Sequence, residues 1–437
     1  MKIHFIGIGG IGISGLAQYM QYKGHQVSGS DIKDTLITQK LRSLGIDITI
    51  PHTGSAITDQ ELIVHSAIIR PDNPEIIAAK EKGIEVVARR EALLKILDDR
   101  KVYSIAGAHG KSTTTAILAS IMDGSAIIGA ESKEFGSNVR YDEKSDVMIF
   151  EADESDGSFL NSNPYCAIVI NAEPEHMEYY DYNYDRFYDS YKTFIKSAKV
   201  KVLNAEDPYL ATLIDEVEAE WIYPSRDIKN IEYILINNEP HTRFEFRDLG
   251  TFSVWGFGKH IALDAALAIV AALDSMNVEE IRTKLLNFKG IKKRFDIVGM
   301  EENRVIIDDY GHHPTEIKAT FESVREYAHL KGFKKITAIW QPHKYSRTID
   351  NLDAFIKCFE GADELIILPV WAASEAHREI DFVEKFKEYN LTMADAIQRN
   401  KNTITVLKDE QELERLDSGI IIGFGAGDIT YQIRGVK

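Results

Sequence analysis

The chain has 437 residues, of which 44% are hydrophobic and 27% charged, a length that suits about three globular domains. Its 51 Lys and Arg against 68 Asp and Glu leave a net charge of −17, which argues against nonspecific binding to nucleic acid or to an anionic membrane. The only cysteines, Cys166 and Cys358, lie far apart, so neither a disulfide framework nor a structural zinc site is expected. No apolar run approaches about 18 residues, and the chain opens on a strand-like segment, so we expect a cytoplasmic protein.

Short apolar segments alternate with helical periods along the whole chain. This alternation is typical of the α/β class, in which parallel sheets carry helices on both faces. It predicts an N-terminal Rossmann-like domain at 1–98, a central P-loop-type domain at 99–289 and a C-terminal Rossmann-like domain at 290–437. The strands we expect lie at 3–6, 26–29, 46–50, 62–65, 84–87, 102–106, 147–150, 167–170, 304–307, 335–339, 364–367, 403–406 and 419–422.

A glycine-rich turn follows the first expected strand. Gly7, Gly9 and Gly12 have the spacing G-x-G-x-x-G, and the second expected strand ends in Asp31. In this pattern the glycines let the backbone approach a diphosphate at the start of a helix. Taken alone it indicates a nicotinamide-dependent dehydrogenase, but the same geometry accepts the diphosphate of a nucleotide sugar. A glycine turn kept only for close packing of helix on sheet is the alternative without a ligand.

A second phosphate-binding pattern begins near residue 103, where the sequence reads YSIAGAHGKSTTT. Ile105 occupies the place of the first glycine in the common spacing G-x-x-x-x-G-K-[ST], and the segment from Gly107 to Ser112 has the shorter form G-x-x-G-K-S. The first N–H groups of a helix favour anions, Lys111 adds a positive charge for the outer phosphates, and Ser112 offers a hydroxyl to Mg²⁺. The pattern predicts an ATP site; the alternative is an ordinary strand, turn and helix with a surface lysine.

Polar side chains gather where two further expected strands end. The segment FEADESD at 150–156 contains four carboxylates, and an apolar strand leads into Glu151. Because parallel strands place ligands at their carboxyl ends, Glu151 is predicted to bind Mg²⁺ beside the nucleotide phosphates. His176 follows the next strand and is a candidate metal or phosphate ligand. A solvated acidic loop and a structural histidine are the respective alternatives.

The last third of the chain has polar loops at the ends of consecutive expected strands. Arg294, close to the predicted domain boundary, is expected to reach an ATP phosphate, with an ordinary surface charge as the alternative. The loops DDYGHHP at 308–314 and WQPHKYSRT at 340–348 both contain histidine. They predict a rim that faces a ligand, unless each is only a capped turn.

The motifs occur in the order GIGGIG, AGAHGKSTTT, EADESD, EPEHM, GKH, KRFD, DDYGHHP, QPHKYSRT and GAGD. In this order, and across essentially its full length, the chain resembles the Mur ligase family. The resemblance implies three α/β domains: the first binds a UDP-sugar, the second binds ATP, and the last closes over both and holds an amino acid.

Within the family, the chain looks most like the members that join L-alanine to UDP-N-acetylmuramate. The resemblance implies amide formation through an acyl phosphate in peptidoglycan precursor synthesis, with ATP as co-substrate and Mg²⁺ or Mn²⁺ as the metal. It implies no nucleic-acid or membrane partner, and a monomer or weak homodimer. Members that reattach a recycled peptide are the alternative inside the family. A nicotinamide-dependent dehydrogenase and a non-catalytic nucleotide-binding regulator are the alternatives from other classes.

The resemblance also implies roles for single residues. Those expected to bind the UDP-sugar are Gly9, Gly10, Ile11, Gly12, Asp31 and Ser66. Those expected to bind ATP are Gly107, Ala108, His109, Gly110, Lys111, Ser112, Thr113, His260, Arg294 and Asp309. The residues expected to hold the metal are Ser112, Glu151 and His176, and those expected to hold the amino acid are His343 and Arg347. The residues expected to act in catalysis are Lys111, Glu151, His176, Arg294 and His343, the last as a candidate general base.

The chain departs from the family pattern in three places. Ala108 and Ser112 stand where threonines are usual, and Ser112 keeps the hydroxyl that a metal needs. In the stretch HIALD, Ile261 and Asp264 replace two asparagines, which affects the expected purine contacts. Lys344 stands where arginine is usual, so a point charge replaces a bidentate group.

Overall fold

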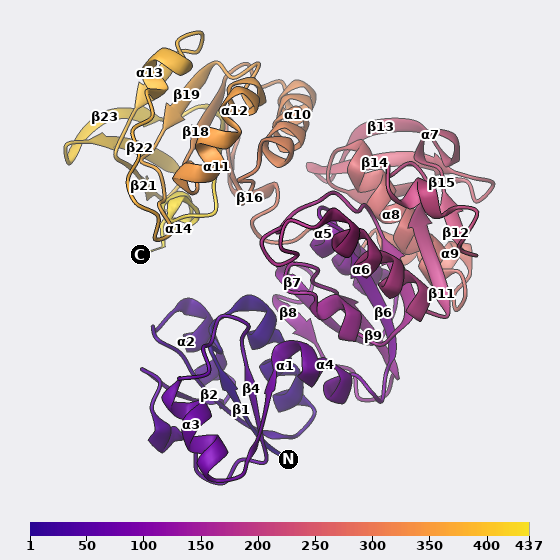
Figure 1. Ribbon diagram of the computed structural model, residues 1–437. Helices are drawn as coiled ribbons and strands as arrows, with labels where there is room; N and C mark the ends of the chain where they lie inside the picture. Colours follow the sequence, from indigo (N-terminus) through magenta and orange to yellow (C-terminus); the bar gives the residue numbers. More distant parts are fainter. Residues whose placement is uncertain (437) are drawn as a thin grey trace. The chain divides into compact units, whose positions relative to one another are not determined.

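Five β-sheets organise residues 1–436, the part of the chain that the computed structural model describes (Figure 1). The chain forms two compact units. The first contains residues 1–231, 244–254 and 260–289, and the second contains residues 232–243, 255–259 and the chain from Gly290 onward. The α/β class predicted from the sequence is confirmed, whereas the limits of the three domains remain a prediction.

The first sheet has five parallel strands in the order β3-β2-β1-β4-β5. Its strands, all five of them predicted, are β1 (Lys2–Ile6), β2 (Gln26–Ser30), β3 (Asp47–Thr49), β4 (Leu62–His65) and β5 (Glu85–Ala88). The helices between them are α1 (Ile11–Tyr22), α2 (Leu36–Ser43), α3 (Pro74–Glu81) and α4 (Arg89–Ile96). The strand order reverses between β1 and β4, so the glycine turn after β1 lies where such sheets bind ligands.

The second sheet has seven strands in the order β12-β11-β10-β6-β9-β7-β8, and its neighbouring strands are parallel except for β7 and β8. The three predicted strands are present as β6 (Lys101–Ala106), β9 (Val147–Glu151) and β10 (Pro164–Val169). The strands that were not predicted are β7 (Ser125–Ser132), β8 (Ser137–Arg140), β11 (Val200–Asn204) and β12 (Glu220–Ile222). The helices are α5 (Lys111–Ile121), α6 (Tyr184–Ser197), α8 (Lys259–Ala272) and α9 (Val278–Leu285).

One hydrophobic core joins these two sheets within the first unit. Phe5 of β1 and Leu16 of α1 belong to the same cluster of buried side chains as Val102 of β6 and Phe150 of β9. Burying one such side chain stabilises a folded chain by about 1.5–3 kcal/mol, so a shared core couples the two sheets strongly. The glycine turn after β1 and the lysine turn after β6 are therefore held by one core.

A three-stranded sheet in the order β13-β14-β15 was not predicted from the sequence. Its strands are β13 (Ile228–Ile236), β14 (Glu239–Phe246) and β15 (Thr251–Trp255), and the short helix α7 (Pro224–Asp227) leads into the first of them. Along β14 buried and exposed residues alternate after Thr242, as expected for a strand with one face in solvent.

The main sheet of the second unit has the order β16-β17-β24-β18-β19-β20 and is parallel except for β16 against β17. Its strands are β16 (Asp296–Glu301), β17 (Arg304–Asp309), β18 (Ile336–Trp340), β19 (Glu364–Ile367), β20 (Leu391–Met393) and β24 (Gly419–Phe424). The helices are α10 (Pro314–Lys331), α11 (Tyr345–Asp350), α12 (Leu352–Cys358), α13 (Phe382–Lys385) and α14 (Ile429–Arg434).

One strand of this unit lies in a different sheet from the one expected. The segment at 403–406 was predicted as part of the parallel sheet, but β22 (Thr403–Lys408) pairs antiparallel with β21 (Ala396–Asn400) and β23 (Gln411–Leu416). Its side chains alternate: Ile404 and Val406 are buried, whereas Thr403 and Thr405 are partly exposed. Such alternation is typical of antiparallel sheets with one solvent-exposed face, whereas strands of a parallel sheet are buried on both faces.

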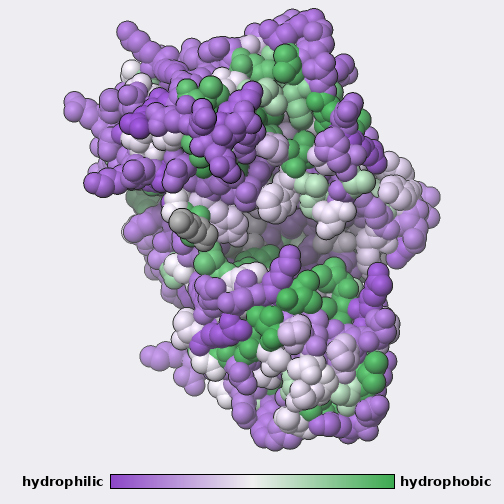
Figure 2. All heavy atoms as spheres, turned by 90° about the vertical axis from the view of Figure 1, so that its left-hand side faces the viewer, coloured by the Kyte–Doolittle hydropathy of each residue, from purple (hydrophilic) through white to green (hydrophobic). Residues whose placement is uncertain are grey.

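The face in Figure 2 is mostly hydrophilic, and its apolar residues gather in several patches. Within residues 1–436, no helix combines the length and the apolar composition that a membrane span requires.

Candidate active site

The lysine turn joins β6 to α5 in a backbone conformation that requires glycine. Gly107 has a φ of +148° and Gly110 a φ of +85°. A Cβ on Gly110 would lie 2.8 Å from Oδ1 of Asp264, a side chain that is itself buried. Only glycine fits these two positions, and the turn delivers the chain into the first turn of α5, whose N–H groups favour an anion.

Asn171 holds this turn in place through hydrogen bonds. It follows β10, and its side-chain amide makes two bonds to one residue of the turn: Oδ1 accepts from the N–H of His109 (3.1 Å), and Nδ2 donates to the carbonyl of His109 (3.0 Å). A paired amide of this kind fixes the backbone at the middle of the turn. The sequence analysis did not identify Asn171 because a single amide after a strand has no spacing that marks it.

Lys111 points back over the turn that precedes it. Its Nζ donates to the carbonyl of Gly107 (2.5 Å) and to Oε1 of Glu154 (2.9 Å), whose side chain is only 2% exposed. Burial opposes the charge on Lys111, but the nearby carboxylates of Glu154, Glu151 and Asp153 together outweigh it and raise the pKa of the ammonium above its usual value. Lys111 is therefore a fixed positive charge at the predicted phosphate site.

Ser112 and Glu151 lie together, as the predicted metal site requires. The Ser112 hydroxyl donates to Oε1 of Glu151 (3.0 Å), and the N–H of Gly129 donates to Oε2 (2.6 Å). Burial raises the pKa of the Glu151 carboxyl, against the attraction of Lys111. Within residues 1–436, no three His, Cys, Asp or Glu side chains converge on one metal position.

His176 is exposed and has a φ of +52° in the loop after β10. In the described part of the chain, no hydrogen bond or ion pair joins it to Ser112 or Glu151. Its role as a metal ligand remains a prediction.

In the glycine turn after β1, Asp31 binds the turn itself. Its Oδ2 accepts from the N–H of Gly9 (2.8 Å), and a Cβ on Gly9 would lie at the same distance from that oxygen. The N–H of Gly7, with a φ of +78°, donates to the carbonyl of Ser30 (2.9 Å). Ser66, also predicted to bind the UDP-sugar, borders the turn: its Cβ lies 3.2 Å from the place that a Cβ on Gly7 would take.

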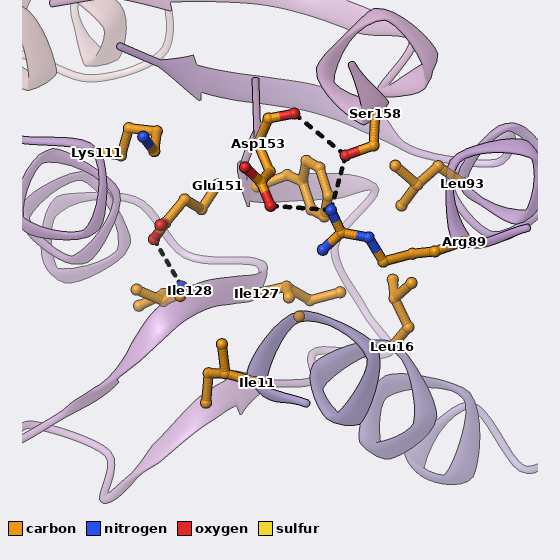
Figure 3. A pocket seen from close by; sticks show the side chains of 13 residues that line it. Ile11, Leu16, Arg89, Leu93, Lys111, Ile127, Ile128, Glu151, Asp153 and Ser158 are labelled. Atoms are coloured by element: carbon orange, nitrogen blue, oxygen red, sulfur yellow. Dashed lines mark hydrogen bonds and ion pairs between the residues drawn. The ribbon is translucent and has the colours of Figure 1, made fainter. Parts of the chain in front are cut away.

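A cleft of about 200 Å³ lies between the two turns in the first unit (Figure 3). One wall is the start of α1, with Ile11 and Gly12, and another carries Lys111 and Glu151. Ile11 and Gly12 of the residues predicted for the UDP-sugar and Lys111 of those predicted for ATP therefore border the same cleft.

Arg89 also lines this cleft, and the sequence analysis did not identify it. It is the first residue of α4, and its Nη2 donates to Oδ2 of Asp153, Oδ2 of Asp156 and Oγ of Ser158, each at 2.9 Å. Burial opposes ionisation of Asp153, but the Arg89 guanidinium, together with a hydrogen bond from Ser155 and the charge of Lys111, outweighs it and lowers the pKa of that carboxyl to about 2. Its position after β5 matches the rule that ligands gather at strand ends, but no motif marks it.

The two histidine loops predicted to form a rim meet in the second unit. The rings of His312 and His343 lie edge to face with centroids 5.7 Å apart, and Nη1 of Arg347 donates to Nδ1 of His343 (3.2 Å). Burial, with Arg347 and Lys344 nearby, lowers the pKa of His343 to about 4; burial likewise lowers that of His312 to about 4. Both rings are neutral at pH 7.

Arg294 and Asp309, predicted to bind ATP, also lie close together in the second unit. Arg294 pairs with Glu316 (3.0 Å), and Asp309 accepts from the N–H groups of Phe295 and Gly311, each at 2.8 Å. Burial raises the pKa of Asp309 to about 6, against the attraction of Arg294. His260, another predicted ATP contact, is exposed at the start of α8 in the first unit, and Thr113 lies in the first turn of α5.

Known protein families match almost the whole length of the chain. Residues 2–101 match the Mur ligase family, catalytic domain; residues 105–272 match the Mur ligase middle domain; and residues 293–415 match the Mur ligase, glutamate ligase domain. The chain belongs to the Mur ligase family.

Among relatives in the family, the UDP-N-acetylmuramate–L-alanine ligase of Campylobacter curvus (strain 525.92) is 52% identical over 434 residues, 99% of either chain. That of Helicobacter pylori (strain P12) is 53% identical over 437 residues, 99% of this chain and 96% of its own. A solved UDP-N-acetylmuramate–alanine ligase from Thermotoga maritima superposes with a TM-score of 0.82 at 24% identity, over 99% of this chain and 97% of that one. A solved murein peptide ligase from Psychrobacter arcticus superposes with a TM-score of 0.65 at 20% identity, over 100% of this chain and 99% of that one. At these identities the two solved structures support the fold alone.

Proposed function

We propose that this chain is an ATP-dependent ligase that joins L-alanine to UDP-N-acetylmuramate, giving UDP-N-acetylmuramoyl-L-alanine, ADP and phosphate in peptidoglycan precursor synthesis. The observation that carries the proposal is the cleft in the first unit, with a diphosphate-type glycine turn on one wall and Lys111 with Glu151 on another. A dehydrogenase transfers no phosphoryl group, so it would not require the wall that carries Lys111 and Glu151. Relatives 52% and 53% identical over nearly the whole chain bear the name of this reaction.

The chemistry requires that a carboxylate be activated, because its oxygen is a poor leaving group. Transfer of the γ-phosphoryl group of ATP to the carboxylate forms an acyl phosphate and releases ADP. The amine of L-alanine then attacks the acyl carbon, the bond from that carbon to the phosphate oxygen breaks, and the nitrogen loses a proton. Catalysis of such a transfer depends on positioning and on positive charge around the moving phosphoryl group.

Lys111 and the first turn of α5 supply that charge from the chain itself. A phosphate oxygen at the turn replaces the Gly107 carbonyl as an acceptor for the Lys111 ammonium, while the bond to Glu154 keeps the ammonium oriented. The phosphates thus meet a cation whose position is set in advance, and little reorganisation is needed during the transfer.

Ser112 and Glu151 fit a divalent metal. Their oxygens lie 3.0 Å apart, and Mg²⁺ in nucleotide sites is commonly held by one or two protein oxygens together with phosphate oxygens and water. Ser112, Glu151 and His176 would hold Mg²⁺ or Mn²⁺, which when bound neutralises charge on the phosphates. The N–H of Gly129 holds the Glu151 carboxylate in place for that role.

For L-alanine we propose the rim of the second unit. The guanidinium of Arg347 suits the carboxylate of an amino acid. Because a guanidinium only donates, Nδ1 of His343 is the acceptor in their bond, and Nε2 of the neutral ring carries the proton. We therefore assign His343 the role of a hydrogen-bond donor rather than that of a general base.

Release of ADP tests the function. Purified chain is mixed with ATP, Mg²⁺ and UDP-N-acetylmuramate, and the rate is measured with L-alanine, glycine, L-serine or a recycled tripeptide as the amine. We expect L-alanine to give a kcat/KM at least tenfold above the others. Preference for the tripeptide would instead indicate the recycling ligase. In a separate assay with NAD⁺ added, reduction of NAD⁺ without ADP release would indicate a dehydrogenase.

We also propose that the chain is a monomer or weak homodimer and that the reaction takes place in the cytoplasm. The oligomeric state is measured on the same preparation.

A further inference from the structure

Arg89 lies in the cleft of the first unit, and the chemistry above gives it no part. Its side chain is only 16% exposed, although it carries a charge. It begins α4, which follows β5 of the first sheet, but its guanidinium donates to Asp153, Asp156 and Ser158 of the acidic loop that follows β9 in the second sheet. Figure 3 shows its side chain beside Asp153 and Ser158. The charge of Arg89 therefore lies between the start of α1 and the acidic loop.

The acidic loop needs such a cation. Glu151, Asp153, Glu154 and Asp156 place four carboxylates within six residues, beside a site where two polyanionic substrates are proposed to bind. Lys111 pairs with Glu154, and Arg89 pairs with both Asp153 and Asp156. Without Arg89 the loop would hold two unpaired carboxylates, which repel phosphates and one another.

The other end of the guanidinium faces the glycine turn. A Cβ on Gly12 would lie 2.2 Å from Nη1 of Arg89, a distance that no real contact allows. Gly12 lies in the first turn of α1, where the diphosphate is proposed to bind. The guanidinium therefore fills the space between the start of α1 and the acidic loop.

We propose that Arg89 is a positioning residue that couples the two substrate sites. It holds the acidic loop beside Lys111 at a fixed position relative to the diphosphate turn at the start of α1. The inference rests on the proposed function and adds to it a residue that sets the relative placement of the two substrates. Misplacement of reacting groups by about 1 Å lowers a rate about a hundredfold, so a residue with this role affects the rate without touching either substrate.

The test compares Arg89→Met, which keeps the length of the side chain but removes the charge, with Arg89→Lys and with the matched control Arg90→Met. Arg90 is the next residue of the same helix and is exposed. Binding of a non-hydrolysable ATP analogue is measured by calorimetry with and without UDP-N-acetylmuramate, and kcat is measured for each variant. Thermal unfolding shows that each variant is folded.

We expect UDP-N-acetylmuramate to tighten binding of the analogue at least fivefold in the unaltered chain and in Arg90→Met. In Arg89→Met this tightening should vanish and kcat should fall at least tenfold, with Arg89→Lys in between. Asp156→Asn should give the same kind of loss, and the combination with Arg89→Met should lose no more than Arg89→Met alone, because both remove one interaction. Unchanged tightening and kcat in a folded Arg89→Met would overturn the inference, whereas an unaltered chain that makes no product would overturn the proposed function.

Discussion

At the scale of single residues, the pair of Lys111 and Glu154 combines a role in catalysis with a role in stability. From the sequence, Lys111 was expected to bind the outer phosphates of ATP and to act in catalysis. The structure adds a role in stability, because removal of Lys111 leaves the carboxylate of Glu154 buried without its partner. An uncompensated buried charge of this kind lowers the free energy of unfolding by about 3 kcal/mol.

We predict that Lys111→Met lowers kcat by about 10²–10³-fold and also lowers the melting temperature. Adding Glu154→Gln removes the uncompensated charge, so the double variant should regain most of the lost stability and none of the lost rate. Steady-state kinetics and thermal unfolding of the three chains measure the two effects separately. A double variant that recovers turnover would contradict the role of Lys111.

Asp264 should make stability depend on pH. Burial raises the pKa of its carboxyl to about 8, compared with about 4 in an unfolded chain. The folded chain therefore holds a proton that the unfolded chain has lost, and stability falls as pH rises from about 4 to about 8. Asp264→Asn removes this term, so the variant should gain about 3 kcal/mol relative to the unaltered chain between pH 5.5 and pH 8.5. Urea unfolding of both chains at the two pH values measures the change, and an equal difference at both would show that Asp264 is ionised when folded.

The functional roles of single residues were the feature least predictable from the sequence. Lys111, Ser112 and Glu151 were found because glycine spacing and an apolar strand mark them, and the structure places them together. Arg89 and Asn171 were missed because their partners lie 62 or more positions away in the chain. No local pattern records a contact that forms only when distant strands or sheets come together.

At the scale of elements, the turn between β6 and α5 has a testable requirement for glycine. We predict that Gly110→Ala weakens binding of an ATP analogue at least tenfold, because a Cβ there meets buried Asp264 as well as an unfavourable φ. Gly24→Ala is the matched control: its φ of +88° is nearly the same, but nothing lies within 4 Å of a Cβ there. The control should lose about 1–2 kcal/mol of stability and no affinity. Equal loss of affinity in both variants would contradict a specific requirement for glycine at Gly110 in nucleotide binding.

Burial explains part of the difference between the strands that were predicted from the sequence and those that were missed, although β7 and β11 were missed inside a sheet. Continuous apolar runs such as β6 and β24 are buried on both faces of parallel sheets, and they were predicted nearly to the residue. β8 and β13 contain polar or exposed residues and lie at sheet edges, where the pattern is weak. β22 was found but assigned to the wrong sheet, because a short strand does not specify its partners.

At the scale of the whole molecule, an acidic chain is proposed to bind anionic substrates. The net charge of −17 gives no general attraction for them, so binding must depend on local groups. Those groups are the glycine turn at α1 and Lys111 with the start of α5 in the first unit, and Arg294 and Arg347 in the second. The family and fold class followed from motif order across the whole chain, whereas the geometry of each site required the structure.

The central claim is that the carboxylate of the UDP-sugar is phosphorylated before the amide forms. UDP-N-acetylmuramate labelled with ¹⁸O in its carboxylate, incubated with the chain, ATP, Mg²⁺ and L-alanine, tests this claim in a single turnover analysed by mass spectrometry. The account predicts that one labelled oxygen leaves with the inorganic phosphate for each amide bond formed, because the bond from carbon to that oxygen breaks. Amide formation with unlabelled phosphate would contradict it.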